Sequence, residues 1–510
     1  MNRPKIITIL LLIFIIRFPQ DMRLPLSLRL PEETRFRWTS ISFSEGDESR
    51  IFVVSQDSAR GGVPYKTAWG HKGPLIYFIL SLVIRLFGNN VIALHIFTTV
   101  YLLISILFIY LISKRLFNEG VSLFVSLAYG LFFTVRQFTG FLSNGEIFMM
   151  LPAIIAIFCF IIYLQNEKQP SATLLLCGLF TAASILIKQT AFFTTVICPV
   201  TLIIRKLCVR QYRWSLFFRE MLFYLSGITV LFLAVFLYFL LHNAIDDFWF
   251  GFYTFNFSYT KVLPIATGLR RILIFLLSIL KEEFITFSAL SSAVLIFFKK
   301  DYFLELRRFV YFVLGLTFFS FIGVAWGRYM HGHYFLQMGL PFSLLIGLGI
   351  SAIKIEEKDL SKMFYAVTLT LAIYSVLSSA FFMVSYYRKT DTYTSYKIAK
   401  YIQENTTERD NIYILGDEPI IYFLANRKAP TRYFDWLYIS KNNGSILRIG
   451  DSVLPELKKN KPKYVVYQRS KWLYRIYHKR IKDVEKFIFQ NYHIEKDIEH
   501  HLIYRCNQGH

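Results

Sequence analysis

Acidic and basic side chains gather in a polar stretch near the start of the sequence. Asp47, Glu48 and Arg50 lie within four residues, and His71 and Lys72 directly precede an apolar run. If Asp47 opens a helix, Arg50 lies on the same face, where its guanidinium can hold a phosphate close to the carboxylate. These residue types suit acid–base chemistry on a phosphate-bearing ligand. In the plainer interpretation, Asp47 caps a surface helix, Arg50 forms an exposed ion pair, and the basic side chains anchor at lipid headgroups.

More ionisable and aromatic side chains stand where long apolar runs begin or end. An ionisable group at such a place is costly unless it faces protein or a wet cavity, so it is a functional candidate. These candidates, together with Tyr65 from the first polar stretch, are Glu146, Lys188, Arg328, His333 and Tyr334. The five residues other than Tyr65 have structural alternatives: Glu146 suits a helix N-terminus, Lys188 suits a membrane boundary, and the last three suit the start of a helix.

The sequence predicts no metal site and no disulfide framework. His331 and His333 are separated by one residue, which on an α-helix points them about 200° apart, and no nearby carboxylate completes a site. The five cysteines follow neither metal-ligand nor disulfide spacing.

Long apolar runs must position these residues, and they predict a polytopic membrane protein. The 510 residues are 55% hydrophobic and 18% aromatic, with a mean hydropathy of +0.43. A bilayer core needs about 20 apolar residues per helix, and about eleven runs approach that length, the first of them interpreted as an uncleaved span. They are 6–16, 91–112, 120–139, 145–164, 172–187, 190–204, 222–241, 284–298, 309–324, 336–353 and 364–384. The shorter run 74–87 predicts an interfacial helix.

The formal charge of +23 comes from 57 Lys and Arg against 34 Asp and Glu. No nucleic-acid module accompanies it, so we expect no nucleic-acid partner. The basic residues lie between apolar runs, where they set topology in the plasma (inner) membrane. Their distribution places the first loop (about 20–90), the turn around Gly145, segments 242–271 and 327–335, and everything after Ser385 outside the cytoplasm.

After Ser385 the composition becomes charged and polar. Helical patterns at 395–404 and 418–425 alternate with strand patterns at 411–415 and 463–467, which predicts a small extracytoplasmic α/β domain. The chain is therefore expected to divide into a membrane domain, 1–385, and a C-terminal domain, 386–510.

The order of these motifs resembles the glycosyltransferase C superfamily, particularly its protein O-mannosyltransferase-like branch, which includes the lipid A aminoarabinose transferases. In that family an Asp-Glu pair opens the first outer loop, an Arg follows at the third position after the Asp, and a Lys-Pro-Pro-Leu-like element comes later. Here the matching residues are Asp47, Glu48, Arg50 and the run Lys72-Gly73-Pro74-Leu75, with Gly in place of one Pro. The resemblance continues through 143–146, 186–191, 332–337 and 411–434.

The resemblance implies an inverting glycosyltransferase that takes a hexose or pentose from a polyprenyl-phosphate-linked donor to an extracytoplasmic lipid A, glycan or protein. Asp47 would be the catalytic base and Glu48 its orienting neighbour. The resemblance implies the lipid-linked sugar as donor substrate and leaves metal dependence open. The implied donor-phosphate contacts are Arg50, Lys72, His71, Lys188, Arg328, His333 and Tyr334, and further candidates are Glu146 and Tyr65.

Two other classes of protein stay open. A polytopic lipid or sugar transporter or flippase would also have many spans and scattered polar gates, although no inverted repeat is evident in the sequence. An assembly scaffold would use the outer domain as its partner-binding module.

Overall fold

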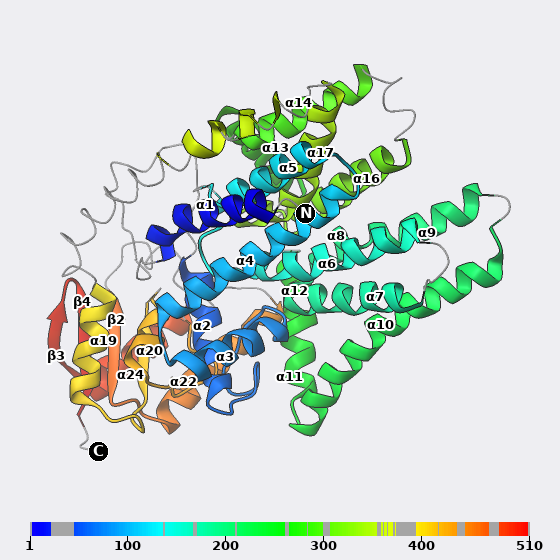
Figure 1. Ribbon diagram of the computed structural model, residues 1–510. Helices are drawn as coiled ribbons and strands as arrows, with labels where there is room; N and C mark the ends of the chain where they lie inside the picture. The colour runs from blue at the N-terminus through cyan, green and yellow to red at the C-terminus, as the bar shows by residue number, and fades with distance from the viewer. Residues whose placement is uncertain are drawn as a thin grey trace. The chain divides into compact units, whose positions relative to one another are not determined.

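The computed structural model is mostly helical, with one small sheet, and divides into two units that are described separately (Figure 1). It describes residues 3–21, 45–135, 138–166, 171–209, 212–260, 265–282, 284–298, 307–353, 359–360, 362–364, 366–370, 373, 394–416, 418–435, 444–468 and 479–507.

The first unit comprises Met1–Met22, His95–Leu237 and Leu263–Val384. Its helices are α1 (Arg3–Asp21), α4 (Val91–Lys114), α5 (Glu119–Phe132), α6 (Gly145–Gln165), α7 (Ser171–Ile187), α8 (Ala191–Thr195), α9 (Ile197–Cys208), α10 (Trp214–Leu241), α13 (Ile265–Glu282), α14 (Phe284–Phe298), α16 (Arg307–Ala325), the 3₁₀ helix η4 (Gly332–Met338) and α17 (Gly339–Ala352). The ends of α4 and α10 extend into the second unit.

Local sequence accounts for how these helices begin and pack. Asn118 caps α5, because its side-chain oxygen accepts a hydrogen bond of 2.9 Å from the backbone N–H of Val121. Helices α7 and α10 approach closely at Gly178, where a Cβ atom would lie 1.9 Å from the carbonyl oxygen of Tyr224. A larger residue at position 178 would therefore force the two helices apart.

Six described segments are long and apolar enough to cross a membrane: α4, α6, α8 with α9, α10, α16, and η4 with α17. They correspond to six of the eleven predicted spans. The spans predicted at 120–139, 172–187 and 284–298 form the shorter apolar helices α5, α7 and α14; α5 ends at Phe132, before a turn. The predicted first span lies in α1, which is not among the six, and its helix carries Arg3, Lys5, Arg17 and Asp21. The span predicted at 364–384 lies largely outside the described residues.

The second unit gathers three segments that are distant in sequence, Arg23–Leu94, Tyr238–Val262 and Ser385–His510. Its first two segments hold α2 (Glu45–Ala59), α3 (Pro74–Phe87), α11 (Ile245–Trp249), the π-helix η3 (Phe250–Thr254) and α12 (Phe255–Thr260). Helix α3 has the bounds predicted for the interfacial helix, because Pro74 pre-sets its first turn. Its placement at a membrane interface stays a prediction.

The third segment forms an α/β fold with α19 (Thr394–Asn405), β1 (Ile412–Leu415), α20 (Ile420–Ala425), α22 (Gly444–Lys459), β2 (Tyr464–Gln468), α24 (Lys479–Asn491), β3 (Tyr492–Ile498) and β4 (His501–Cys506). The sheet order is β1-β2-β4-β3, with Ile412 opposite Tyr464 in the parallel pair and Tyr464 opposite Arg505 in the antiparallel pair. The two predicted helices and two predicted strands are confirmed as α19, α20, β1 and β2. Helices α22 and α24 and strands β3 and β4 were not predicted.

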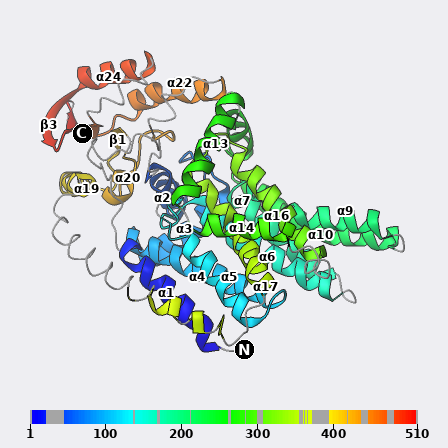
Figure 2. The same ribbon diagram turned by 90° about the horizontal axis from the view of Figure 1, so that it is seen from above.

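Helices cover both faces of this sheet. Tyr401 of α19 packs on Tyr464, whereas Phe489 of α24 packs on Tyr467. Because side chains alternate along a strand, positions 464 and 467 point to opposite faces. Helices α22 and α24 lie side by side in both views (Figures 1 and 2).

Helix α2 packs directly on the α/β fold, within the same unit. The ring of Phe52 lies 5.5 Å from the ring of Phe423 in α20, and the side-chain amide of Gln56 donates a 3.0 Å hydrogen bond to the Phe423 carbonyl oxygen. The unit boundary at Val384–Ser385 coincides with the composition change in the sequence. The division into a catalytic domain, 1–385, and a separate C-terminal domain stays a prediction.

Candidate functional site

Asp47 lies in the first turn of α2, where the free N–H groups and the helix dipole favour a negative charge. Arg50 lies on the same face, and its Nη1 atom is 3.1 Å from Asp47 Oδ1. The predicted pairing of these two side chains is therefore present. Asp47 keeps 17% of its side chain exposed, so a ligand can reach it.

Lys72 approaches the same carboxylate from the loop between α2 and α3. Its Nζ atom is 3.1 Å from Asp47 Oδ2, so each carboxylate oxygen of Asp47 meets one cation. Two buried tyrosines fix the Lys72 backbone: the Tyr65 hydroxyl donates a 2.6 Å hydrogen bond to its carbonyl oxygen, and the Tyr77 hydroxyl accepts one of 3.1 Å from its N–H.

Tyr65 has a structural role in this loop. Its backbone is left-handed, with a φ of 70°, and its side chain is fully buried. Burial raises the pKa of the Tyr65 hydroxyl, and the neighbouring Tyr77 raises it further. The hydroxyl therefore stays protonated and keeps donating to Lys72.

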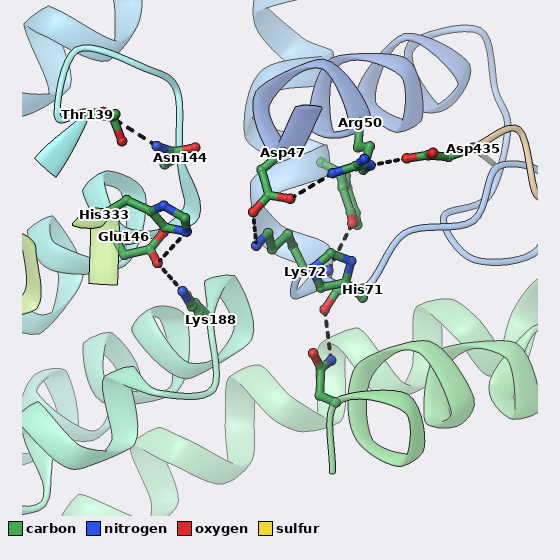
Figure 3. A network of polar contacts seen from close by, with 12 residues as sticks. Asp47, Arg50, His71, Lys72, Thr139, Asn144, Glu146, Lys188, His333 and Asp435 are labelled. Carbon is green, nitrogen blue, oxygen red and sulfur yellow. Dashed lines mark hydrogen bonds and ion pairs between the residues drawn. The ribbon is translucent and has the colours of Figure 1, made fainter. Parts of the chain in front are cut away.

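A second carboxylate holds the other end of Arg50. The Nε atom of Arg50 donates to Asp435, whose side chain is completely buried (Figure 3). Asp435 follows the α20 helix of the C-terminal fold and is separated from Arg50 by 385 residues in sequence. The network thus consists of two carboxylates and two cations, and Asp47 is its most exposed member. We call Asp47, Arg50, Lys72 and Asp435 the Asp47 cluster.

His71 and Glu48 flank this cluster in different ways. The backbone oxygen of His71 accepts a 2.8 Å hydrogen bond from the side chain of Asn256, and the His71 ring lies 5.8 Å from the ring of Phe255. Glu48 is 1% exposed, so its side chain points into the protein while that of Asp47 remains accessible. This difference favours Asp47 over Glu48 as the carboxylate that meets a ligand.

The first unit contains a separate group, which we call the Glu146 cluster: Glu146, Lys188, His333 and Tyr334. Glu146, in the first turn of α6, forms a buried ion pair with Lys188, which follows the end of α7 (Figure 3). The Nε2 atom of His333 is 3.7 Å from Glu146 Oε1, and Lys188 Nζ lies 4.3 Å above the Tyr334 ring. Only 1% of the Glu146 side chain is exposed.

The two histidines near this cluster do not diverge as expected. His331 is the residue before η4 and has extended backbone, with φ −66° and ψ 142°, so the α-helical angle does not apply. The rings of His331 and His333 stack 5.6 Å apart instead. Within the part of the chain that the structure describes, no group of three or more metal-ligating side chains is present.

Arg328 lies elsewhere in the first unit, on left-handed backbone with a φ of 59°. Its Cβ atom would lie 2.9 Å from a Cβ atom placed on Gly268 of α13, so the two backbones approach closely there. The structure thus brings Asp47, Arg50 and Lys72 together in one unit, and Glu146, Lys188, His333 and Tyr334 together in the other.

Sequence reasoning missed Asp435. It stands in the run Thr431-Arg432-Tyr433-Phe434-Asp435, whose spacing carries no signature of a site. The resemblance described above ends at residue 434, one residue before Asp435. A buried position for an aspartate is unusual without a partner, but burial itself is visible only in the folded chain.

The fold is similar to that of a protein of known structure. ArnT from Cupriavidus metallidurans in the apo state aligns with a TM-score of 0.59 and 13% identity, over 90% of this chain and 93% of that one. The structure of the same protein bound to undecaprenyl phosphate gives a TM-score of 0.60, with the same identity and coverage.

Two family models match parts of the sequence. Residues 71–242, about a third of the chain, match the family of dolichyl-phosphate-mannose-protein mannosyltransferases. Residues 394–507 match a family described as the competence-induced protein Ccs4 C-terminal domain. Among curated proteins, none matches the sequence.

The fold over nine-tenths of the chain and the mannosyltransferase match over residues 71–242 both support the resemblance to the glycosyltransferase C superfamily. It is an integral membrane protein. The resemblance inferred from Asp47, Glu48, Arg50 and the Lys72 element is confirmed at this level.

Proposed function

We propose that this protein transfers a sugar from a polyprenyl-phosphate-linked donor to an acceptor hydroxyl outside the cytoplasm. The observation that carries the proposal is the setting of Asp47, a partly exposed carboxylate with one nitrogen of Arg50 and one of Lys72 each 3.1 Å away. A base and a phosphate clamp are the two things such a reaction needs at one place. The match of residues 71–242 to the family of dolichyl-phosphate-mannose-protein mannosyltransferases supports glycosyl transfer as the chemistry.

Donor binding would release Asp47 for catalysis. A phosphate ester bound to Arg50 and Lys72 competes for the nitrogens that pair with the carboxylate, because both anions use the same donors. The freed carboxylate can then accept a proton. The exchange also brings the leaving group next to the base.

The reaction itself is a single displacement. The acceptor oxygen attacks the anomeric carbon on the side opposite the phosphate, forming a new C–O bond as the bond to the phosphate oxygen breaks. The electron pair leaves with the phosphate, where Arg50 and Lys72 stabilise its charge, and the hydroxyl proton passes to Asp47. The anomeric centre is inverted.

The identity of the donor lipid is supported by the ArnT fold. That protein has been solved with undecaprenyl phosphate, and we propose a donor on the same class of carrier. The sugar is a hexose or pentose, and the acceptor a lipid A, a surface glycan or a protein.

The membrane topology belongs to the same proposal. The basic residues predict that the first loop, segment 242–271 and the chain after Ser385 lie outside the cytoplasm. These segments supply most of the second unit. Segments that form one compact unit must lie on the same side of the membrane, as this topology predicts. We therefore propose that the Asp47 cluster faces outward from the plasma (inner) membrane.

The remaining site candidates have smaller proposed roles. Lys188 and His333 would contact the donor phosphate or sugar, with Tyr334 beneath the Lys188 ammonium. Lys188 ranks after Arg50 and Lys72 because its carboxylate partner Glu146 is only 1% exposed, whereas their shared partner Asp47 is 17% exposed. His71 and Arg328 stay predictions as donor contacts, and Glu48 as a neighbour that orients Asp47.

The test is a release assay with the purified protein in lipid nanodiscs. Given a labelled polyprenyl-phosphate sugar and an extract of candidate acceptors, the protein should release polyprenyl phosphate and label one acceptor class. A transporter or flippase reconstituted in vesicles would move the lipid across the bilayer without cleaving it. Movement without cleavage, over a panel of hexose and pentose donors, would reject glycosyl transfer.

A further inference from the structure

The C-terminal fold contributes a side chain to the Asp47 cluster. We propose that Asp435 is a positioning residue for the transfer reaction: it holds the Nε side of Arg50 so that Nη1 faces Asp47 and the phosphate. The proposal rests on the proposed function, in which Arg50 binds the donor phosphate. It assigns the C-terminal fold a direct part in the site.

The geometry of Arg50 requires such a holder. An arginine side chain is long, and fixing it in one rotamer costs conformational entropy. Arg50 is anchored at two points of its planar group, with Nε donating to Asp435 and Nη1 lying 3.1 Å from Asp47. Because the guanidinium is rigid, fixing the Nε edge sets the direction of the remaining N–H groups.

Asp435 is itself rigidly placed. Its side chain has no exposed area, and its charge acts on neighbouring buried groups: burial raises the pKa of the Tyr413 hydroxyl in β1, and the negative charge of Asp435 raises it further. The preceding residue is also held, because the Tyr422 hydroxyl donates to the Phe434 carbonyl oxygen at 3.4 Å. Asp435 therefore extends the rigid edge of the α/β fold to Arg50.

The same short segment also holds the loop that carries Lys72. The backbone N–H of Trp69 donates a 2.9 Å hydrogen bond to the Arg432 carbonyl oxygen, and the Trp69 ring lies 5.8 Å from the Tyr433 ring. Arg432 continues outward to an ion pair of 2.6 Å with Asp247. Residues 432–435 thus touch both sources of cations in the cluster, α2 through Arg50 and the loop before Lys72 through Trp69.

The alternative is that Asp435 only stabilises the C-terminal fold, independently of Arg50. The two roles differ in how substitutions combine. A residue that acts through Arg50 has nothing left to position once Arg50 is gone, whereas a residue that acts through the fold keeps its effect.

The experiment is a double-mutant cycle on the full-length protein in nanodiscs, measuring kcat and KM for polyprenyl phosphate release. Asp435→Asn should lower kcat/KM by about tenfold to a hundredfold, because a displaced catalytic group has an effect of that size. In an Arg50→Gln background, Asp435→Asn should change kcat/KM by less than about twofold, since interacting pairs are non-additive. The double variant leaves neither charge buried alone, so the comparison survives if Asp435→Asn by itself does not fold.

Asp247→Asn is the matched control, because it makes the same substitution at an ion pair of the same segment without touching Arg50. Both partners there are partly exposed, so kcat/KM should change by less than about fivefold. A full Asp435→Asn loss in the Arg50→Gln background, or wild-type kcat/KM for Asp435→Asn, would overturn the positioning role. Failure of the wild-type protein to release polyprenyl phosphate from any donor would instead reject the proposed function.

Discussion

Two carboxylates, one in each unit, meet lysines in very different surroundings. Asp47 is 17% exposed and shares its two oxygens between Arg50 and Lys72, whereas Glu146 is 1% exposed and pairs with Lys188. The Asp47 cluster is assembled from a helix, a loop and the C-terminal fold. The Glu146 cluster is assembled from the ends of apolar helices.

Because of this difference, the carboxylate of the Asp47 cluster can exchange its ion-pair partners for a ligand. In the Glu146 cluster the same exchange has a large free-energy cost. A partly exposed carboxylate can release its two cations to an incoming phosphate. Water then solvates the carboxylate, and the phosphate neutralises the cations. The Glu146–Lys188 pair, with 1% and 11% of its side chains exposed, has lost most of its hydration, and removing one partner strands the other charge. We therefore expect substitutions at Asp47 to affect mainly activity, and substitutions at Glu146 to affect mainly stability.

The largest expected effect is that of Asp47→Asn on turnover. Asparagine keeps the shape of the side chain but cannot remove the proton from the hydroxyl of the acceptor substrate. The kcat should therefore fall by about 10²- to 10⁴-fold, the usual contribution of general-base catalysis. Undecaprenyl phosphate should still bind to the purified variant. Turnover and lipid binding are measured on the same nanodisc preparation.

Asp57→Asn is the control for that substitution. Asp57 lies in the same helix with a similar exposure, 13% of its side chain, and pairs with Lys428 at 3.4 Å instead of with the cluster. Its variant should retain wild-type turnover. An Asp47→Asn variant that is as active as Asp57→Asn would remove Asp47 as the base.

The next effect is that of Glu146→Gln on stability. Loss of the carboxylate leaves Lys188 buried without its counter-charge, which should cost about 3–5 kcal/mol of unfolding free energy. Thermal unfolding in nanodiscs measures the change. The comparison is Lys114→Gln, which breaks the more exposed pair with Glu119 in the same unit and should cost less than about 1 kcal/mol. Equal costs for both variants would contradict the contrast drawn between the two clusters.

A smaller effect on activity is expected for Lys72→Gln. One charge-assisted contact to the donor phosphate is worth about 1.5–3 kcal/mol, which corresponds to a loss of about tenfold to a hundredfold in kcat/KM. The loss should be the same for donors that carry different sugars, because Lys72 is proposed to meet only the phosphate. A loss that depends on the sugar would show that Lys72 contacts the sugar and not the phosphate.

The smallest effect concerns Glu495, a carboxylate of the C-terminal fold that is 21% exposed. Burial alone would raise its pKa, but hydrogen bonds from Tyr401 and Tyr464 and the nearby Arg505 outweigh it and lower the pKa. A lowered pKa in the folded state contributes stability above the usual carboxyl range, and this contribution is lost as the pH falls through the folded-state value.

Glu495→Gln should remove that acid-dependent part, which we expect to be below about 1 kcal/mol because Glu495 and Arg505 are both partly exposed. Amide exchange of strands β3 and β4 between neutral and acidic pH measures it. An unchanged acid dependence in the variant would show that other carboxylates set it.

Some features followed from sequence because their causes are local. The bounds of α3 were predictable since an apolar run of helical length begins at Pro74 and is followed by Gly88. The Asp47–Arg50 pair was predictable because residues three apart share a helix face. Strands β1 and β2 were recognisable as apolar runs and are buried throughout.

Other elements escaped prediction for equally physical reasons. Strand β3 is largely exposed along its length and is rich in charged residues, so its sequence lacks the apolar alternation of a half-buried strand. The predicted span 120–139 is too long because α5 ends at Phe132, where a turn follows within an apolar run. Hydropathy alone does not mark that end.

The sequence by itself determined that the apolar helices suit a lipid bilayer, and it determined the residue types at the site. The length of an apolar run is a property of a short stretch of chain. The same is true of the spacing of Asp47, Arg50 and Lys72, so both features are visible without the fold. Only the tertiary structure decided that Asp435 closes the network, because its contact with Arg50 spans 385 residues. Such a contact depends on how the α/β fold packs against α2, and no local pattern encodes that packing.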